Sequence, residues 1–223
     1  MDELTLVQQL AVLVLPVILA ITVHEAAHGY VADRLGDHTA RMLGRVTLNP
    51  LRHIDPLGTV LLPLGMYALT GFLFGWAKPV PVNPRNLARP RRDMAIVAVA
   101  GPLSNLAMAT LWSLAIVVGI WLYPASEWVA APLVYMGAAG VLINAILLVL
   151  NMIPLPPLDG GRVLVGLLPT RLARLVAQVE PYGLFILVAL LVTGVLGRLA
   201  SPFVIGLIKL LPGSPAVLEL FLT

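Results

Sequence analysis

The stretch Ala20-Ile-Thr-Val-His-Glu-Ala-Ala-His-Gly-Tyr30 places two histidines and a glutamate directly after an apolar run that begins at Leu4. About 20 apolar residues cover the roughly 30 Å of hydrocarbon in a bilayer, so this run predicts a membrane-spanning helix. Imidazole and carboxylate groups are costly to place at membrane depth. Their presence there indicates a functional site rather than a polar cluster that only packs helices together.

His24, Glu25 and His28 form the motif H-E-x-x-H. On a helix, histidines at positions i and i+4 share one face, and the adjacent glutamate lies close enough to activate a metal-bound water. The motif is typical of zinc hydrolases. A catalytic zinc ion takes three protein ligands and leaves its fourth position for water, so one more ligand is needed.

Asp159 is the predicted third ligand. The chain has no cysteine, so the metal must be held by histidines and carboxylates, and His38 and His53 are the only other histidines. Asp159 closes the stretch Asn151-Met-Ile-Pro-Leu-Pro-Pro-Leu-Asp159, whose prolines impose non-helical backbone. Such backbone is tolerated at membrane depth only when it is buried or lines a cavity. A turn-forming aspartate before Gly-Gly is the alternative interpretation.

Composition gives the class of protein. Of the 223 residues, 59% are hydrophobic and 11% are charged, whereas a soluble domain carries about 25% charged residues. We expect one membrane-embedded domain over residues 1–223, with the catalytic core at about 15–170 and a C-terminal helix at about 182–210. The sequence Met1-Asp-Glu-Leu4 lacks the basic region of a cleavable signal peptide. No nucleic-acid partner is expected.

The hydropathy pattern predicts an all-α polytopic bundle. Four apolar runs are long enough to be clear transmembrane helices: 4–32, 94–123, 129–152 and 182–210. A fifth run, 57–77, is interrupted by proline and glycines and is expected to be a broken, re-entrant segment, with a full span as the alternative. Basic residues cluster around 34–52, 78–92 and 162–174 and are absent from 123–129, which predicts that the three clusters are cytoplasmic.

The segment Trp76-Ala-Lys-Pro-Val-Pro-Val-Asn83 is predicted to be extended, because proline disfavours helix at its own position and at the residue before it. One interpretation is a stiff linker. The other is an edge at the membrane surface that pairs with a substrate peptide through the amides of Lys78, Val80 and Val82.

Three motifs in this order resemble those of the site-2 protease family of intramembrane zinc metalloproteases. They are His24-Glu25-x-x-His28, Gly101-Pro-Leu-Ser-Asn105 and Leu158-Asp159-Gly160. The resemblance covers residues 15–170 and implies a multi-pass protein of a prokaryotic inner membrane that cleaves the transmembrane helix of a protein substrate. The 72 residues between His28 and Gly101 contain no stretch that looks like a PDZ domain, so the chain resembles the compact bacterial or archaeal type.

The resemblance implies one zinc ion per chain, held by His24, His28 and Asp159, with Glu25 as general base. It also suggests that Asn105 orients substrate or stabilises the oxyanion, although Asn105 could equally be a hydrogen-bonding residue between helices. Asn151 is a second candidate for that role, and Asn144 and Thr22 are candidates for polar lining of the site.

His53 is a candidate for a position beside the metal ligands, although it reads most simply as a turn residue. Two other functions stay open: a metal or proton transporter that uses the same cluster, and an inactive relative that binds membrane helices. Oligomeric state and substrate identity are not predicted.

Overall fold

The computed structural model describes residues 5–61, 65 and 78–222, and within these ranges every regular element is helical. The predicted all-α class is therefore confirmed. The helices, in chain order, are α1 (Leu6–Arg34), α2 (Thr39–Met42), α4 (Pro90–Leu122), α5 (Glu127–Asn151), α6 (Asp159–Leu167), α7 (Thr170–Ala177), α8 (Glu180–Val192), α9 (Val195–Lys209) and α10 (Ser214–Phe221). Short 3-10 turns lie at Pro50–Arg52 and Pro84–Asn86, and a single π-helical turn lies at Pro56–Leu61.

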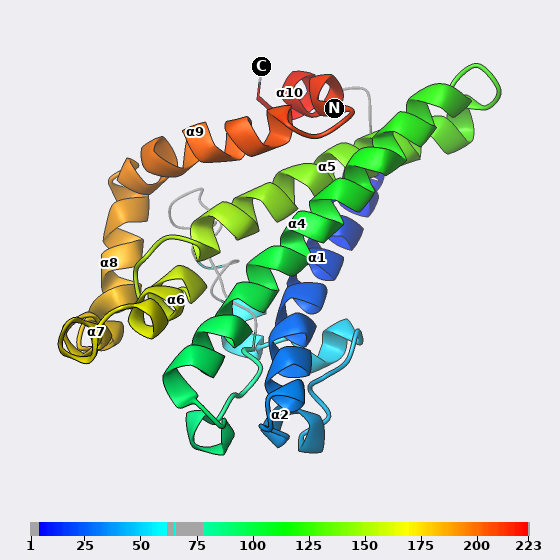
Figure 1. Ribbon diagram of the computed structural model, residues 1–223. Coiled ribbons are helices and arrows are strands. Elements are labelled where there is room, and N and C mark those ends of the chain that lie inside the picture. Colours follow the sequence, from blue (N-terminus) through cyan, green and yellow to red (C-terminus); the bar gives the residue numbers. More distant parts are fainter. Residues whose placement is uncertain (1–4, 62–64, 66–77, 223) are drawn as a thin grey trace.

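Helices α1, α4 and α5 pack beside one another and form the body of the molecule (Figure 1). These three helices are long and apolar enough to cross a bilayer, which makes this a membrane protein. Small residues bring α4 and α5 close together: a Cβ atom at Gly140 would overlap the indole ring of Trp112, and one at Gly137 would overlap Ile116. Close approach through small residues is how apolar helices gain packing energy in lipid.

The prediction of four clear spans is not confirmed for the run 182–210. The structure divides this run into α8 and α9 at Gly194, whose φ of +71° is a left-handed conformation that glycine adopts without strain. Hydropathy does not distinguish a glycine that ends a helix from one inside a helix. The run therefore looks continuous in the sequence. Helices α7 and α8 form a pair bent by 59°, which could serve as one broken span.

After the break, α9 lies along α5 and leads to α10 (Figure 1). Their apolar side chains, together with those of α4, form the buried core at this end of the bundle. Its fully or nearly fully buried members are Ile116, Ala138, Val141, Ala145, Val204, Ile208 and Val217. This core fixes the position of α5 and does not include the polar residues of the predicted site.

Most of the predicted broken segment 57–77 lies outside the described residues, apart from 57–61 and Gly65. The described part of the predicted extended segment, 78–83, contains neither helix nor β-strand, so a strand there is not confirmed. Its main chain is instead held by single hydrogen bonds to other parts of the protein. The amide of Lys78, for example, donates to the carbonyl oxygen of His53 at 2.8 Å.

The basic clusters gather at one end of the bundle. Arg34 ends α1, Arg41 lies in α2, and Arg91 and Arg92 lie in the first turn of α4. The turn that joins α4 to α5 lies at the opposite end (Figure 1). This arrangement agrees with the orientation that the charge pattern predicts.

Because the chain has no native cysteine, a single introduced cysteine reports the side of the membrane unambiguously. Cysteines at Arg45, Arg89 and Arg171 should react with a membrane-impermeant maleimide only from the cytoplasmic side, and a cysteine at Ser126 only from outside. Labelling of Arg45 and Arg89 positions from opposite sides would show that the segment between them crosses the membrane.

Candidate metal centre

The H-E-x-x-H histidines lie on the last third of α1, with side chains directed into the bundle. His24 and His28 are 7% and 8% exposed. At 1.5 Å per residue they lie about 15 Å and 9 Å from the end of the helix at Arg34, which is within one leaflet of a bilayer. The i, i+4 spacing brings their Nε2 atoms to 3.1 Å from each other.

Asp159 meets the two histidines from the first turn of α6. Its Oδ2 atom lies 3.2 Å from His24 Nε2 and 3.3 Å from His28 Nε2, and the residue is 5% exposed. Close approach of the α6 start to the preceding loop sets this position. A Cβ atom at Gly160 would overlap the carbonyl of Met152, and one at Gly161 would overlap the main chain of Pro156.

The hydrogen bonds around this triangle suit a cation site. His28 Nδ1 lies 2.8 Å from the carbonyl oxygen of Val97, which can only accept, so that nitrogen carries the proton. His24 Nδ1 lies 2.6 Å from Asn105 Oδ1, an amide oxygen that can only accept. When both imidazoles are neutral, their Nε2 atoms therefore present lone pairs to each other and to Asp159 Oδ2, which is buried without a hydrogen-bond partner.

The size of the triangle also fits a metal. Tetrahedral ligand atoms about 2.0–2.1 Å from a zinc ion are separated from one another by about 3.3 Å. The three observed separations, 3.1, 3.2 and 3.3 Å, match this value. Within the described residues, this is the one group of three such side chains that could hold a metal ion.

Gly101 of α4 lies directly over the two imidazole rings. A Cβ atom at this position would overlap His28 Nε2 and His24 Cε1. The glycine of the Gly101-Pro-Leu-Ser-Asn105 motif thus lets α4 approach the ligand face of α1. Four residues further along the same helix face, Asn105 reaches His24.

Glu25 lies beside the cluster but is not one of its three members. Its Oε2 atom accepts a hydrogen bond of 2.8 Å from the amide of Val80, in the segment 78–83. Val80 itself is buried, at 7% exposed. The amides of Lys78 and Val80, two of the three predicted to bind substrate, are therefore bonded within the protein.

Asp37 fixes the far end of this segment, and sequence reasoning missed it. Its buried carboxylate accepts from the amide of Asn83 at 2.6 Å and from the side-chain nitrogen of Asn86 at 2.7 Å. Burial alone would raise the pKa of Asp37, but hydrogen bonds from Thr39, Asn86 and Asn83 hold the pKa below its usual range. An Asp that follows a helix is a common surface residue, so the sequence carried no signal of this role.

The other predicted site residues differ in how they relate to the triangle. Asn105 is fully buried and bonds His24, Asn144 and the carbonyl of Ala20. Asn151 is half-buried near the end of α5, where its Nδ2 donates to the carbonyl of Leu147 at 2.9 Å. His53 is buried outside the triangle and its Nε2 lies 3.0 Å from the carbonyl of Thr47.

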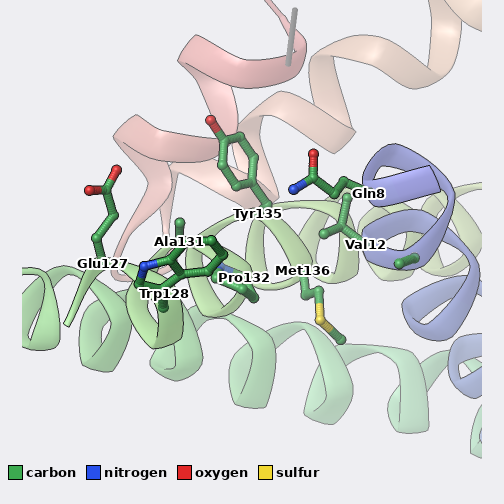
Figure 2. Close-up of a pocket in the computed structure, with 9 residues that line it drawn as sticks. Gln8, Val12, Glu127, Trp128, Ala131, Pro132, Tyr135 and Met136 are labelled. Carbon is green, nitrogen blue, oxygen red and sulfur yellow. The ribbon is translucent and has the colours of Figure 1, made fainter. Parts of the chain in front are cut away.

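A separate hollow of about 460 Å³ lies at the other end of α1. Figure 2 shows Gln8 and Val12 of α1 across from Trp128, Tyr135 and Met136 of α5. Its lining is mainly apolar, and His24 and Asp159 are not part of it. The hollow therefore offers no metal ligands and is distinct from the candidate centre.

Comparison with known proteins shows the family of this chain. The family model described as "Peptidase family M50" matches residues 113–194, a region that contains Asp159 but not the histidines. A Bacillus subtilis (strain 168) protein named "Putative zinc metalloprotease YwhC" is 40% identical over 184 residues, which are 81% of this chain and 80% of that protein. The chain belongs to peptidase family M50, the site-2 protease family.

Two further relatives share the name "Putative zinc metalloprotease Rip2". The protein from Mycolicibacterium smegmatis is 32% identical over 81% of this chain and 66% of its own length. The protein from Mycobacterium tuberculosis (strain H37Rv) is 32% identical over 78% of this chain and 63% of its own length. No solved structure matches the chain. Membership of family M50 makes the protein a metalloprotease.

Gly101→Ala should disrupt the metal centre, because the added methyl group overlaps both ligand imidazoles. We expect loss of most bound metal in the purified protein, measured by elemental analysis, with the protein still extracted as a folded monodisperse species. Gly197→Ala is the matched control, since a Cβ atom at that helical glycine meets nothing within 4 Å. Normal metal content in the Gly101 variant would contradict the placement of α4 over the site.

Asp37→Asn should loosen the segment 78–86, because an amide nitrogen replaces a carboxylate oxygen that faces donors. Loss of the buried hydrogen bonds should cost about 1–3 kcal/mol of the free energy of unfolding at pH 7. Since the pKa of Asp37 is lower in the folded state, its contribution is present above about pH 4 and is lost as pH falls through the folded pKa. The difference in thermal stability between wild type and variant should therefore shrink on acidification, and a constant difference would contradict this role.

Proposed function

We propose that this protein is an intramembrane zinc endopeptidase of a prokaryotic inner membrane, a multi-pass protein that cleaves a peptide bond in or near the transmembrane helix of a protein substrate. The observation that carries the proposal is the triangle of lone pairs formed by His24, His28 and Asp159. It lies about 9–15 Å from the end of an apolar helix, at a depth where only a membrane-embedded substrate segment would meet it.

Each residue has a role in this proposal. His24, His28 and Asp159 hold the zinc ion, which when bound supplies Lewis acidity for hydrolysis at neutral pH. Glu25 acts as general base and passes the proton to the leaving amine. The amide of Val80 orients the Glu25 carboxylate through Oε2 and leaves the other oxygen for proton transfer.

Substrate access is proposed to involve the segment 78–86. Between this segment and the start of α6 lies a hollow of about 380 Å³, and its lining includes Val82, Pro84, Pro156 and Arg162. An unwound stretch of substrate could enter here from the cytoplasmic side and approach Asp159. Because a helical peptide bond is sheltered by its own hydrogen bonds, substrates with helix-breaking residues should be cleaved faster.

A transporter is the second candidate, and the distribution of buried polar groups does not favour it. Beyond His24, toward the start of α1, the described buried polar side chains are neutral: Thr22, Asn105, Ser113 and Asn144. An ion or proton pathway usually needs ionisable side chains along its course. In the described residues the ionisable cluster lies in one half of the bundle.

Glu25→Gln separates hydrolysis from metal binding. The amide keeps the shape of the side chain but cannot accept a proton, so cleavage should fall by at least about 100-fold while zinc stays at one per chain. His24→Ala and Asp159→Ala should instead lose both zinc and activity. The measurement is the detection of peptide products from candidate single-span proteins, with and without a zinc chelator, alongside elemental analysis. Retained cleavage in Glu25→Gln would require another base, and absence of zinc from the wild type would refute the proposed function.

A further inference from the structure

The buried side chains of Asn105 and Asn144 form a directed chain of hydrogen bonds that ends at a metal-facing histidine. Asn105 lies on α4 and Asn144 on α5, and both are 0% exposed. We propose that these two asparagines set the tautomer of His24 and thereby present its Nε2 lone pair to the metal. This inference rests on the proposed zinc site and adds two positioning residues to it.

The direction of the chain starts from a backbone carbonyl. The carbonyl oxygen of Gly140 can only accept, so the group of Asn144 that lies 2.8 Å from it is the amide nitrogen. The oxygen of Asn144 therefore accepts from Asn105 Nδ2, at 2.9 Å. The oxygen of Asn105 then accepts from His24 Nδ1, at 2.6 Å, and places the imidazole proton on that nitrogen.

Asn105 cannot reverse its amide without losing several contacts. Its Nδ2 also lies 3.4 Å from the carbonyl oxygen of Ala20, a second acceptor. A reversed amide would place an oxygen against that carbonyl and against Asn144 Oδ1, in a site with no exposure to water. Buried acceptors that face each other without a proton are strongly disfavoured.

The two ligand histidines differ in what fixes them. His28 donates Nδ1–H to the carbonyl of Val97, so the backbone sets its tautomer. Among the described residues, the partner of His24 Nδ1 is the side chain of Asn105, whose own orientation depends on Asn144. Partners that fix the other ring nitrogen of a ligand histidine commonly raise metal affinity 10–100-fold.

The burial of Asn105 also argues against direct contact with substrate. All of its donor hydrogens and the oxygen facing His24 are engaged within the protein, and no surface of the side chain is exposed. Its action on the reaction is therefore through His24, as is that of Asn144. Asn105 and Asn144 therefore connect the packed helices α4 and α5 to His24 on α1.

The test measures the zinc dissociation constant of detergent-purified full-length protein by competition with a chromophoric chelator. The variants are Asn144→Leu, Asn105→Leu, Asn105→Asp and the double leucine variant. Ser113→Ala is the matched control, since Ser113 is equally buried on α4 but bonds the carbonyl of Pro212 instead. Each protein is also assayed for thermal stability without metal and for the visible absorption spectrum with Co²⁺.

We expect Asn144→Leu to weaken zinc binding about 10-fold, and Asn105→Leu up to about 100-fold, with an altered Co²⁺ spectrum in both. Ser113→Ala should match wild type in zinc affinity and spectrum. The double leucine variant should be no weaker than Asn105→Leu, because both changes act through the same histidine.

The Asn105→Asp variant distinguishes a role in positioning His24 from a role in packing the helices. The carboxylate still accepts from His24 Nδ1 but faces other acceptors, so it should keep zinc affinity closer to wild type than leucine does, while lowering the stability of the metal-free protein. If the asparagines only hold helices together, leucine should bind zinc at least as tightly as aspartate.

Wild-type zinc affinity and spectrum in Asn144→Leu and Asn105→Leu would overturn the inference while leaving the proposed zinc site intact. Failure of the wild-type protein to bind zinc would instead refute the site itself. If a leucine variant cannot be purified folded, the comparison of Asn105→Asp with Ser113→Ala decides, and an affinity loss of 100-fold or more in Asn105→Asp would then overturn the inference.

Discussion

Three lone pairs converge on one point inside an apolar bundle, and the rest of the structure is arranged around that constraint. His24 Nε2, His28 Nε2 and Asp159 Oδ2 lie within 3.1–3.3 Å of one another. Without a cation these atoms repel each other in a region where water cannot compensate. A bound metal would turn the same arrangement into a favourable one, and metal binding would then be coupled to local stability at this site.

Holding such a triangle requires close contact between elements that are far apart in sequence. Gly101 removes the side chain that would block α4 from the imidazoles, and Gly160 and Gly161 let α6 begin against the loop that precedes it. These glycines work by absence of a Cβ atom. Because they leave this space free, Asp159 can lie against the face of α1 that carries His24 and His28.

The polar residues that support the site are all paired, in the manner expected of buried polar groups in lipid. One hydrogen-bonded chain runs from α5 through Asn144 and Asn105 to His24. A second group of bonds runs from Asp37 and Glu25 to the segment 78–86. The first reaches the proposed metal ligand His24, and the second places a stretch of main chain beside Glu25, the proposed general base.

The sequence by itself determined the membrane class and the three long helices, and it predicted the three side chains that the structure brings together, His24, His28 and Asp159. Hydropathy is a local property and H-E-x-x-H is a local motif, so both can be recognised without knowledge of the fold. The tertiary structure alone decided that the run 182–210 breaks at Gly194, that Asp37 anchors the segment 78–86, and that Asn105 turns to His24 rather than to the surface. Each of these depends on a backbone angle or on a contact across tens of residues, and neither is encoded in the composition of a neighbouring stretch.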